Sequence, residues 1–195
     1  MNVDISAPRL LEVVHRYHPT NLYSGEAGYY ESAQYQRLEE ARDEAMKHPA
    51  LWKRCLARLS EVLPECKVQD WTTLFSNDNC WRVRVYLPEV VKLPGGVEEF
   101  RAVVVLVSIL APVYVLYSSF QRNSEQGASP STTFYEDVPE TKAHADKVEA
   151  IVREMLNVHR LPNEMLFTLV PDIQVRNTRL GEAKLIDCLF TDDRW

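Results

Sequence analysis

The amino-acid sequence predicts an α+β fold: a single domain with helices packed on one face of an antiparallel sheet. Three observations lead to this class. Residues 101–121 form an apolar run that is rich in valine and tyrosine. Apolar residues before Pro64 recur at helical spacing, whereas those between 81 and 87 alternate with polar residues. A further helical pattern follows the strands, so helices are expected both before and after the strands along the chain.

Length and charge restrict the class of protein. A chain of 195 residues with 46% hydrophobic and 26% charged residues can bury a full core, so we expect one domain over residues 1–195. The formal net charge is −6 and the pI is about 5.4. General nucleic-acid binding requires a basic surface. The negative charge therefore argues against a nucleic-acid partner and suits a basic protein partner.

Four helices are predicted from the apolar spacing. Ser6 can cap the first one, and Pro19 ends it. The second covers 31–47 and carries acidic residues on its outer face. The other two are expected between Pro49 and Pro64 and from Thr141 to Val158.

Strands are expected between the third and fourth helices. Residues 68–75 and 81–87 read as strands joined by a turn at 76–79, with Trp81, Val83, Val85 and Leu87 inward. A short strand is expected at 165–170. Residues 180–190 fit a strand and a short helix equally well. The polar segment 121–139 is predicted to be a mobile loop.

The apolar run 101–121 is interpreted as two buried strands joined by a tight turn around Leu110–Pro112. A transmembrane helix is the alternative, because about 20 apolar residues span a bilayer. However, Pro112 would break a lone helix at mid-membrane, and serines interrupt the run. We therefore expect no membrane contact.

The four cysteines (Cys55, Cys66, Cys80 and Cys188) lack any C-x-x-C pair, which is typical of free thiols in a reducing compartment. The N-terminal residues are neither basic nor followed by an apolar core, so we expect no secretion signal. Both observations predict a cytoplasmic protein.

No catalytic, cofactor or phosphate-loop motif is present in the sequence. His15 and His18 have i, i+3 spacing, but nothing nearby supplies a third metal ligand. Cys80, Ser118 and Ser119 are candidate nucleophiles by residue type alone. We therefore expect no enzymatic activity, no cofactor and no metal.

Arg82 and Arg84 project from the same side of one predicted strand, where two guanidinium groups can clamp a phosphate or a carboxylate. The simpler interpretation, which we favour, places both on the solvated face of the sheet. The clamp remains the basis of an alternative function: a small cytosolic enzyme, or an anion- or nucleotide-binding protein.

The preferred interaction surface is the acidic, tyrosine-rich segment 23–44. Tyrosine offers a large contact area at a low entropy cost, and concentrated acid attracts a basic partner. The residues expected to bind the partner are Tyr23, Tyr29, Tyr30, Glu31, Glu39, Glu40 and Asp43. The alternative is that the tyrosines pack the loop on the core and the acids are a solvated helix face.

The valine- and tyrosine-rich strands at 102–120 and the two C-terminal stretches, 170–175 and 180–195, resemble those of bacterial immunity proteins encoded beside polymorphic or secreted toxins. The resemblance implies a cytoplasmic antitoxin without catalytic residues that binds one cognate toxin and blocks its active site. It implies nothing about which residues bind.

Overall fold

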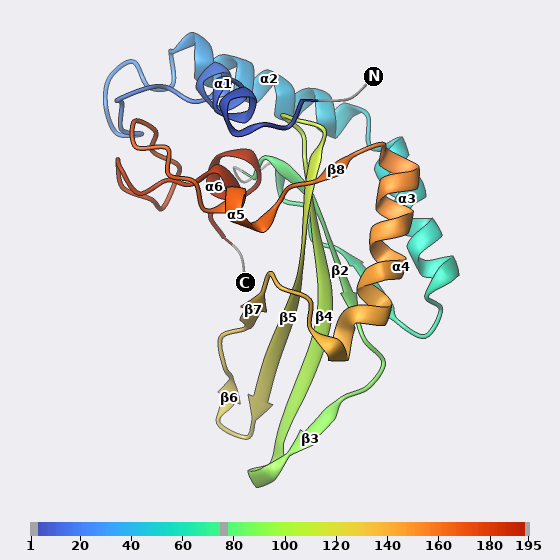
Figure 1. The fold of residues 1–195 in the computed structure, drawn as a ribbon. Coiled ribbons are helices and arrows are strands. Elements are labelled where there is room, and N and C mark those ends of the chain that lie inside the picture. The colour runs from blue at the N-terminus through green and yellow to red at the C-terminus, as the bar shows by residue number, and fades with distance from the viewer. Residues whose placement is uncertain (1–3, 75–77, 194–195) are drawn as a thin grey trace.

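A long β-hairpin forms the centre of the computed structural model, which describes residues 4–74 and 78–193. Strands β4 (Val97–Ser108) and β5 (Val113–Ser124) pair antiparallel from Glu98↔Asn123 to Val107↔Tyr114. The tight turn between them is closed by a 2.7 Å hydrogen bond from the Val113 amide to the Ala111 carbonyl. The apolar run thus forms two paired strands, as predicted (Figure 1).

The sheet is antiparallel except at one short edge. Its main order is β1 (Lys67–Asp70), β2 (Cys80–Tyr86), β4, β5 and β6 (Gly127–Ala128). Strand β3 (Val91–Leu93) pairs with β4, β7 (Thr132–Phe134) pairs with β5, and β8 (His159–Arg160) runs parallel to β5. Together with the helices, this sheet confirms the predicted α+β class.

All four predicted long helices are present: α1 (Ala7–Tyr17), α2 (Ala33–Lys47), α3 (Ala50–Val62) and α4 (Pro139–Leu156). Local signals set their ends. The Ser32 hydroxyl accepts a hydrogen bond from the Tyr35 amide at 3.2 Å and so caps α2. Asn157 adopts a left-handed conformation with φ 50°, and this conformation ends α4.

Helices α3 and α4 pack side by side on one face of the sheet. Trp52 and Leu59 of α3 and Val148 of α4 lie in one buried cluster with Val83 and Val85 of β2. The inward direction predicted for these β2 residues is therefore confirmed.

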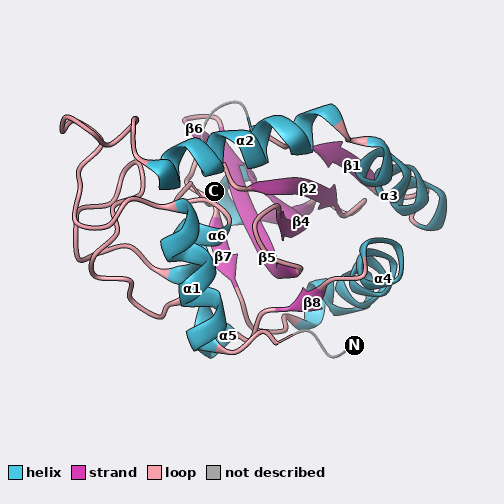
Figure 2. Ribbon diagram, turned by 90° about the horizontal axis from the view of Figure 1, so that it is seen from above, coloured by secondary structure: helices cyan, strands magenta, loops and turns pink. Residues whose placement is uncertain are grey.

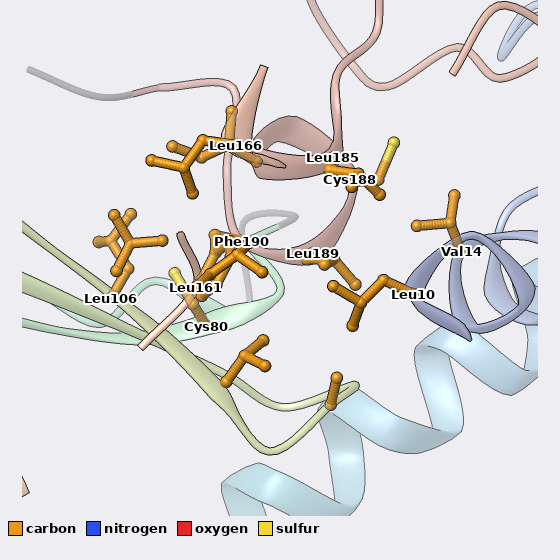
Figure 3. Close-up of a cluster of buried hydrophobic side chains, with 14 of the residues drawn as sticks. Leu10, Val14, Cys80, Leu106, Leu161, Leu166, Leu185, Cys188, Leu189 and Phe190 are labelled. Carbon is orange, nitrogen blue, oxygen red and sulfur yellow. The ribbon is translucent and has the colours of Figure 1, made fainter. Parts of the chain in front are cut away.

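The opposite face is covered as well, by α1, α6 (Leu185–Leu189) and the chain around them. Figure 2 shows the sheet between α3 and α4 on one side and α1 and α6 on the other. Leu10, Leu106, Leu185 and Phe190 belong to this second cluster (Figure 3). Helices therefore lie on both faces of the sheet: α3 and α4 on one, and α1 and α6 on the other, where the sequence predicts helices on one face.

Two local predictions differ from the structure, and one open alternative is decided. The first strand ends at Asp70, where the Asp70 carboxylate accepts a hydrogen bond from the Thr72 amide and turns the chain. The stretch 165–170 contains the end of α5 (Asn163–Leu166) instead of a strand, since Pro162 begins a helical turn there. For residues 180–190, where the sequence fits a strand and a short helix equally well, the structure has the helix α6.

The predicted loop at 121–139 is partly strand, because it contains the end of β5 and strands β6 and β7. Residues 75–77, which include part of the predicted turn at 76–79, lie outside the described residues. Among the described residues, no helix combines the length and the hydropathy that crossing a bilayer requires.

Burial of Phe190 predicts a large contribution to stability. Its side chain is fully buried, so Phe190→Ala should lower the free energy of unfolding by about 3–5 kcal/mol. Leu169→Ala is the control, because Leu169 is 55% exposed and should change stability by less than about 0.5 kcal/mol. Urea denaturation measures both, and equal midpoints for the two variants would show that the tail is not part of the core.

Candidate functional site

The predicted interaction segment comprises the loop before α2 and most of α2 itself (Figure 1). We call residues 23–44 the tyrosine–acid surface. The side-chain amide of Gln36 donates a 2.6 Å hydrogen bond to the Tyr30 carbonyl, so the loop lies against the first turns of α2. The tyrosines of the loop and the acids of the helix are therefore neighbours.

Three tyrosines of this surface pack against one another, two pairs edge to face and the third tilted. The ring centroids of Tyr29 and Tyr30 are 5.2 Å apart, those of Tyr30 and Tyr35 are 5.0 Å apart, and those of Tyr29 and Tyr35 are 5.5 Å apart. Edge-to-face pairs of this kind stabilise one another beyond their burial. The cluster therefore holds each ring in a fixed direction before any partner arrives.

The predicted tyrosines differ in exposure. Tyr23 is 45% exposed and Tyr30 is 50% exposed, whereas Tyr29 is only 6% exposed. Burial raises the pKa of Tyr29 to about 12, so its hydroxyl stays neutral. Tyr23 and Tyr30 are available to a partner. The buried Tyr29 ring packs against the Tyr30 ring.

The predicted acids also separate into two groups. Glu31, Glu40 and Asp43 are exposed, and the exposed Glu44 continues the row along α2. Glu39 is partly buried, and its carboxylate pairs with the guanidinium of Arg42 on the next turn. Glu31, Glu40, Asp43 and Glu44 therefore offer negative charge to solvent, and the exposed Glu26 of the loop adds to it.

Arg42 is a residue of the site that the sequence did not single out. Its guanidinium is buried and donates to Asn79 Oδ1 from Nε at 3.1 Å and from Nη2 at 2.8 Å. Asn79 in turn donates to the Cys188 carbonyl at 2.8 Å. This chain of hydrogen bonds fastens α2 to the C-terminal segment, and only the structure reveals it because the partners are far apart in sequence.

A small pocket of about 160 Å³ opens between the tyrosines and the C-terminal segment. Arg176 lies in its wall with a positive φ of 32°, a conformation that is uncommon outside glycine. With Arg42 in the same wall, the pocket suits a small polar or acidic group. Its lining residues are His18, Ser24, Tyr29, Tyr30, Tyr35, Leu38, Arg42, Val175 and Arg176.

Arg82 and Arg84 lie on the same side of β2, as predicted, but that side is buried. Their exposed fractions are 5% and 4%. The prediction of a solvated pair is wrong because the C-terminal segment covers this part of the sheet. Arg82 Nη2 donates to the Asp193 carbonyl at 2.7 Å and lies 3.3 Å from the Asp78 carboxylate.

Arg84 lacks such an acidic neighbour. Among the residues that the structure describes, it forms no ion pair; it donates to Ser119 Oγ at 2.6 Å and lies 5.0 Å over the Trp71 ring. The Nε atom of Arg84 and the hydroxyl of Tyr117 are both buried without a hydrogen-bond partner. Because Arg84 and Tyr117 both pair with Val104, the two groups lie in one line across the sheet.

The two histidines of the predicted pair contact different partners. The Nε2 atom of His15 lies 2.9 Å from the Asp172 carboxylate, and its Nδ1 atom lies 2.8 Å from the Leu11 carbonyl. His18 is buried, with its Nε2 atom 3.0 Å from the Cys188 carbonyl. Each imidazole is therefore occupied by a separate partner.

The candidate nucleophiles are either hydrogen-bonded to other side chains or buried. The Ser118 hydroxyl shares a 2.6 Å hydrogen bond with Thr141, and the Ser119 hydroxyl accepts from Arg84. Burial raises the pKa of the Cys80 thiol well above its usual range, which keeps it protonated at neutral pH.

The chain matches no protein family model, no curated protein and no solved structure. Its function is therefore inferred from the geometry of these surfaces.

Burial of His18 predicts a pH-dependent stability. Burial lowers the pKa of His18 from 6.5 to about 4, so the unfolded chain binds this proton at a higher pH than the folded chain. The free energy of unfolding should then fall by about 1.4 kcal/mol per pH unit as pH drops from 6.5 towards 4. Urea denaturation at pH 7 and pH 5 measures this loss.

His18→Gln is the matched variant, because its amide can still donate to the Cys188 carbonyl but does not titrate. The wild type should lose about 2 kcal/mol more than His18→Gln between pH 7 and pH 5. Equal losses in the two proteins would mean that His18 does not contribute to the pH dependence.

Proposed function

We propose that this protein binds a basic protein partner through the tyrosine–acid surface, and that it acts as an immunity protein that neutralises a cognate toxin. The main support is the half-exposed Tyr30 ring, held by Tyr29 and Tyr35 beside the exposed acids of α2. The resemblance to immunity proteins is the basis for the functional class, and the geometry of the tyrosines and acids supports this choice of surface.

The tyrosine cluster favours tight binding because it is already ordered. Immobilising a flexible side chain at an interface costs about 0.5–1.5 kcal/mol. Tyr30 avoids much of this cost because two neighbouring rings fix its position. Aromatic anchors of this kind carry most of the free energy at protein interfaces.

The exposed acids favour fast association with a basic surface. Glu40, Asp43 and Glu44 follow one another at helical spacing along the outer side of α2. Charges at the rim of an interface act mainly on the association rate. Glu39 contributes less, since Arg42 already neutralises it.

Charge reversal and ring removal should therefore have separate kinetic effects. Replacing Glu40, Asp43 and Glu44 together with lysine should slow association about tenfold or more and weaken its salt dependence. Tyr30→Ala should leave the association rate nearly unchanged and cost about 2 kcal/mol, mainly by faster dissociation. The partner is first captured with the tagged wild-type protein in its native cells, identified by mass spectrometry, and then measured by surface plasmon resonance.

A triple lysine variant at Glu125, Glu140 and Glu154 is the charge-matched control, because these exposed acids lie outside the tyrosine–acid surface. Wild-type kinetics for the α2 variant and for Tyr30→Ala would exclude this surface. The immunity role has its own readout: expression of the partner alone should stop growth, and co-expression of this protein should restore it. A harmless partner would contradict the antitoxin role without affecting the binding surface.

A second candidate function, anion binding, is favoured by one observation: Arg84 Nε and the Tyr117 hydroxyl are both buried without a hydrogen-bond partner, and both residues pair with Val104 across the sheet. Leaving a buried charge without a counter-ion costs several kcal/mol. A small phosphate or carboxylate group bound to both would satisfy Nε and the hydroxyl together.

Thermal unfolding in rising inorganic phosphate tests this candidate. If Arg84 holds an anion, phosphate at 100 times its Kd should raise the Tm of the wild type by about 5–10 °C. The shift should vanish in Arg84→Gln, while Arg122→Gln, which removes an arginine with a 61% exposed side chain, should keep it. Equal shifts in all three proteins would indicate a general salt effect and reject the site.

A further inference from the structure

Three possible metal ligands of different chemistry meet at the junction of α3, β1 and α4. Glu65 and Cys66 lie in the turn between α3 and β1, and His144 lies on α4. One carboxylate oxygen, the thiol sulfur and one imidazole nitrogen all lie within 4.8 Å of one another. Among the residues that the structure describes, no other group of such side chains converges in this way.

The spacing of these atoms is close to that of a tetrahedral zinc site. Zinc bonds of about 2.0–2.3 Å place neighbouring ligand atoms about 3.3–3.8 Å apart. His144 Nε2 and Glu65 Oε1 are already 3.7 Å apart. The sulfur needs to move by about 1 Å at most, and the exposed Glu65 side chain can follow it by rotation.

The backbone that carries these ligands is held firmly. The Cys66 amide donates a 3.0 Å hydrogen bond to the Leu63 carbonyl, which fixes the turn after α3. Cys66 also packs against the core cluster shared by α3 and α4. On α4, His144 is followed directly by the buried Ala145. The core that joins the two helices therefore fixes the separation of the ligands before any ion binds.

We propose that Glu65, Cys66 and His144 bind a zinc ion that links the end of α3 to α4, with water in the fourth position. A thiolate and a carboxylate together neutralise the two charges of the ion. Imidazole and thiolate ligands bind zinc in preference to magnesium or calcium. Lys147 is the nearby positive charge; its side chain is exposed, so the ammonium group can turn towards solvent.

Binding is measured with Zn²⁺ by calorimetry and with Co²⁺ by absorption. We expect one equivalent of either ion and a thiolate-to-cobalt charge-transfer band. Cys55, Cys80 and Cys188 are buried, so the partly exposed Cys66 is the cysteine that can give this band. Cys66→Ser should abolish the band, and His144→Asn and Glu65→Gln should each weaken zinc binding about tenfold or more.

His48→Asn is the matched control, because His48 is exposed and pairs with Glu44 away from the cluster. It should bind zinc as the wild type does. Zinc at 100 times its Kd should raise the Tm of the wild type by about 5–10 °C and leave that of Cys66→Ser unchanged.

The proposal is overturned if the wild type shows no saturable binding, if cobalt gives no charge-transfer band, or if the cluster variants bind zinc as tightly as His48→Asn. Glu65→Gln keeps the experiment decisive even if Cys66→Ser or His144→Asn fails to fold, since it changes an exposed side chain outside the core. The zinc site does not depend on the tyrosine–acid surface, so neither result predicts the other.

Discussion

The structure depends on a β-hairpin that is buried on both faces. Strand β4 directs Val103 and Val105 towards α3 and α4, and Val104 and Leu106 towards the C-terminal segment. Strand β5 alternates in the same way, with Leu116 in the first cluster and Val115 in the second. A sheet with two apolar faces needs a covering layer on each. That requirement explains why the molecule places helices from distant parts of the chain on opposite sides of one sheet.

Covering the second face also determines where the charged groups lie. Alternation along β2 directs Val83 and Val85 into one core, and it must therefore direct Arg82 and Arg84 towards the other. The two arginines have different partners in the interior: Arg82 lies beside Asp78, and Arg84 lies against an aromatic ring and a serine hydroxyl. The same face thus combines apolar packing with a guanidinium that lacks an acidic partner among the described residues.

Much of the fold could be predicted because its signals are local. The spacing of apolar residues located the four long helices, and Pro112 located the hairpin turn. Burial of Arg82 could not be predicted, since it depends on a contact with Asp193, more than a hundred positions away. For the site, composition identified the tyrosine–acid surface, but only packing separates the buried Tyr29 from the exposed Tyr30. The ligand cluster at Cys66 was also missed, because His144 is distant in sequence.

The late position of α6 in the chain has a consequence for synthesis on the ribosome. The hairpin is translated well before Leu185–Leu189, yet the Ser108 hydroxyl donates to the Leu189 carbonyl and the apolar side chains around it need α6 as cover. During elongation the first face can close with α3 and α4, while the second stays open to water. Nascent chains in this state expose strand surface that favours aggregation, so a chaperone that shields this face during translation would raise the yield of native protein.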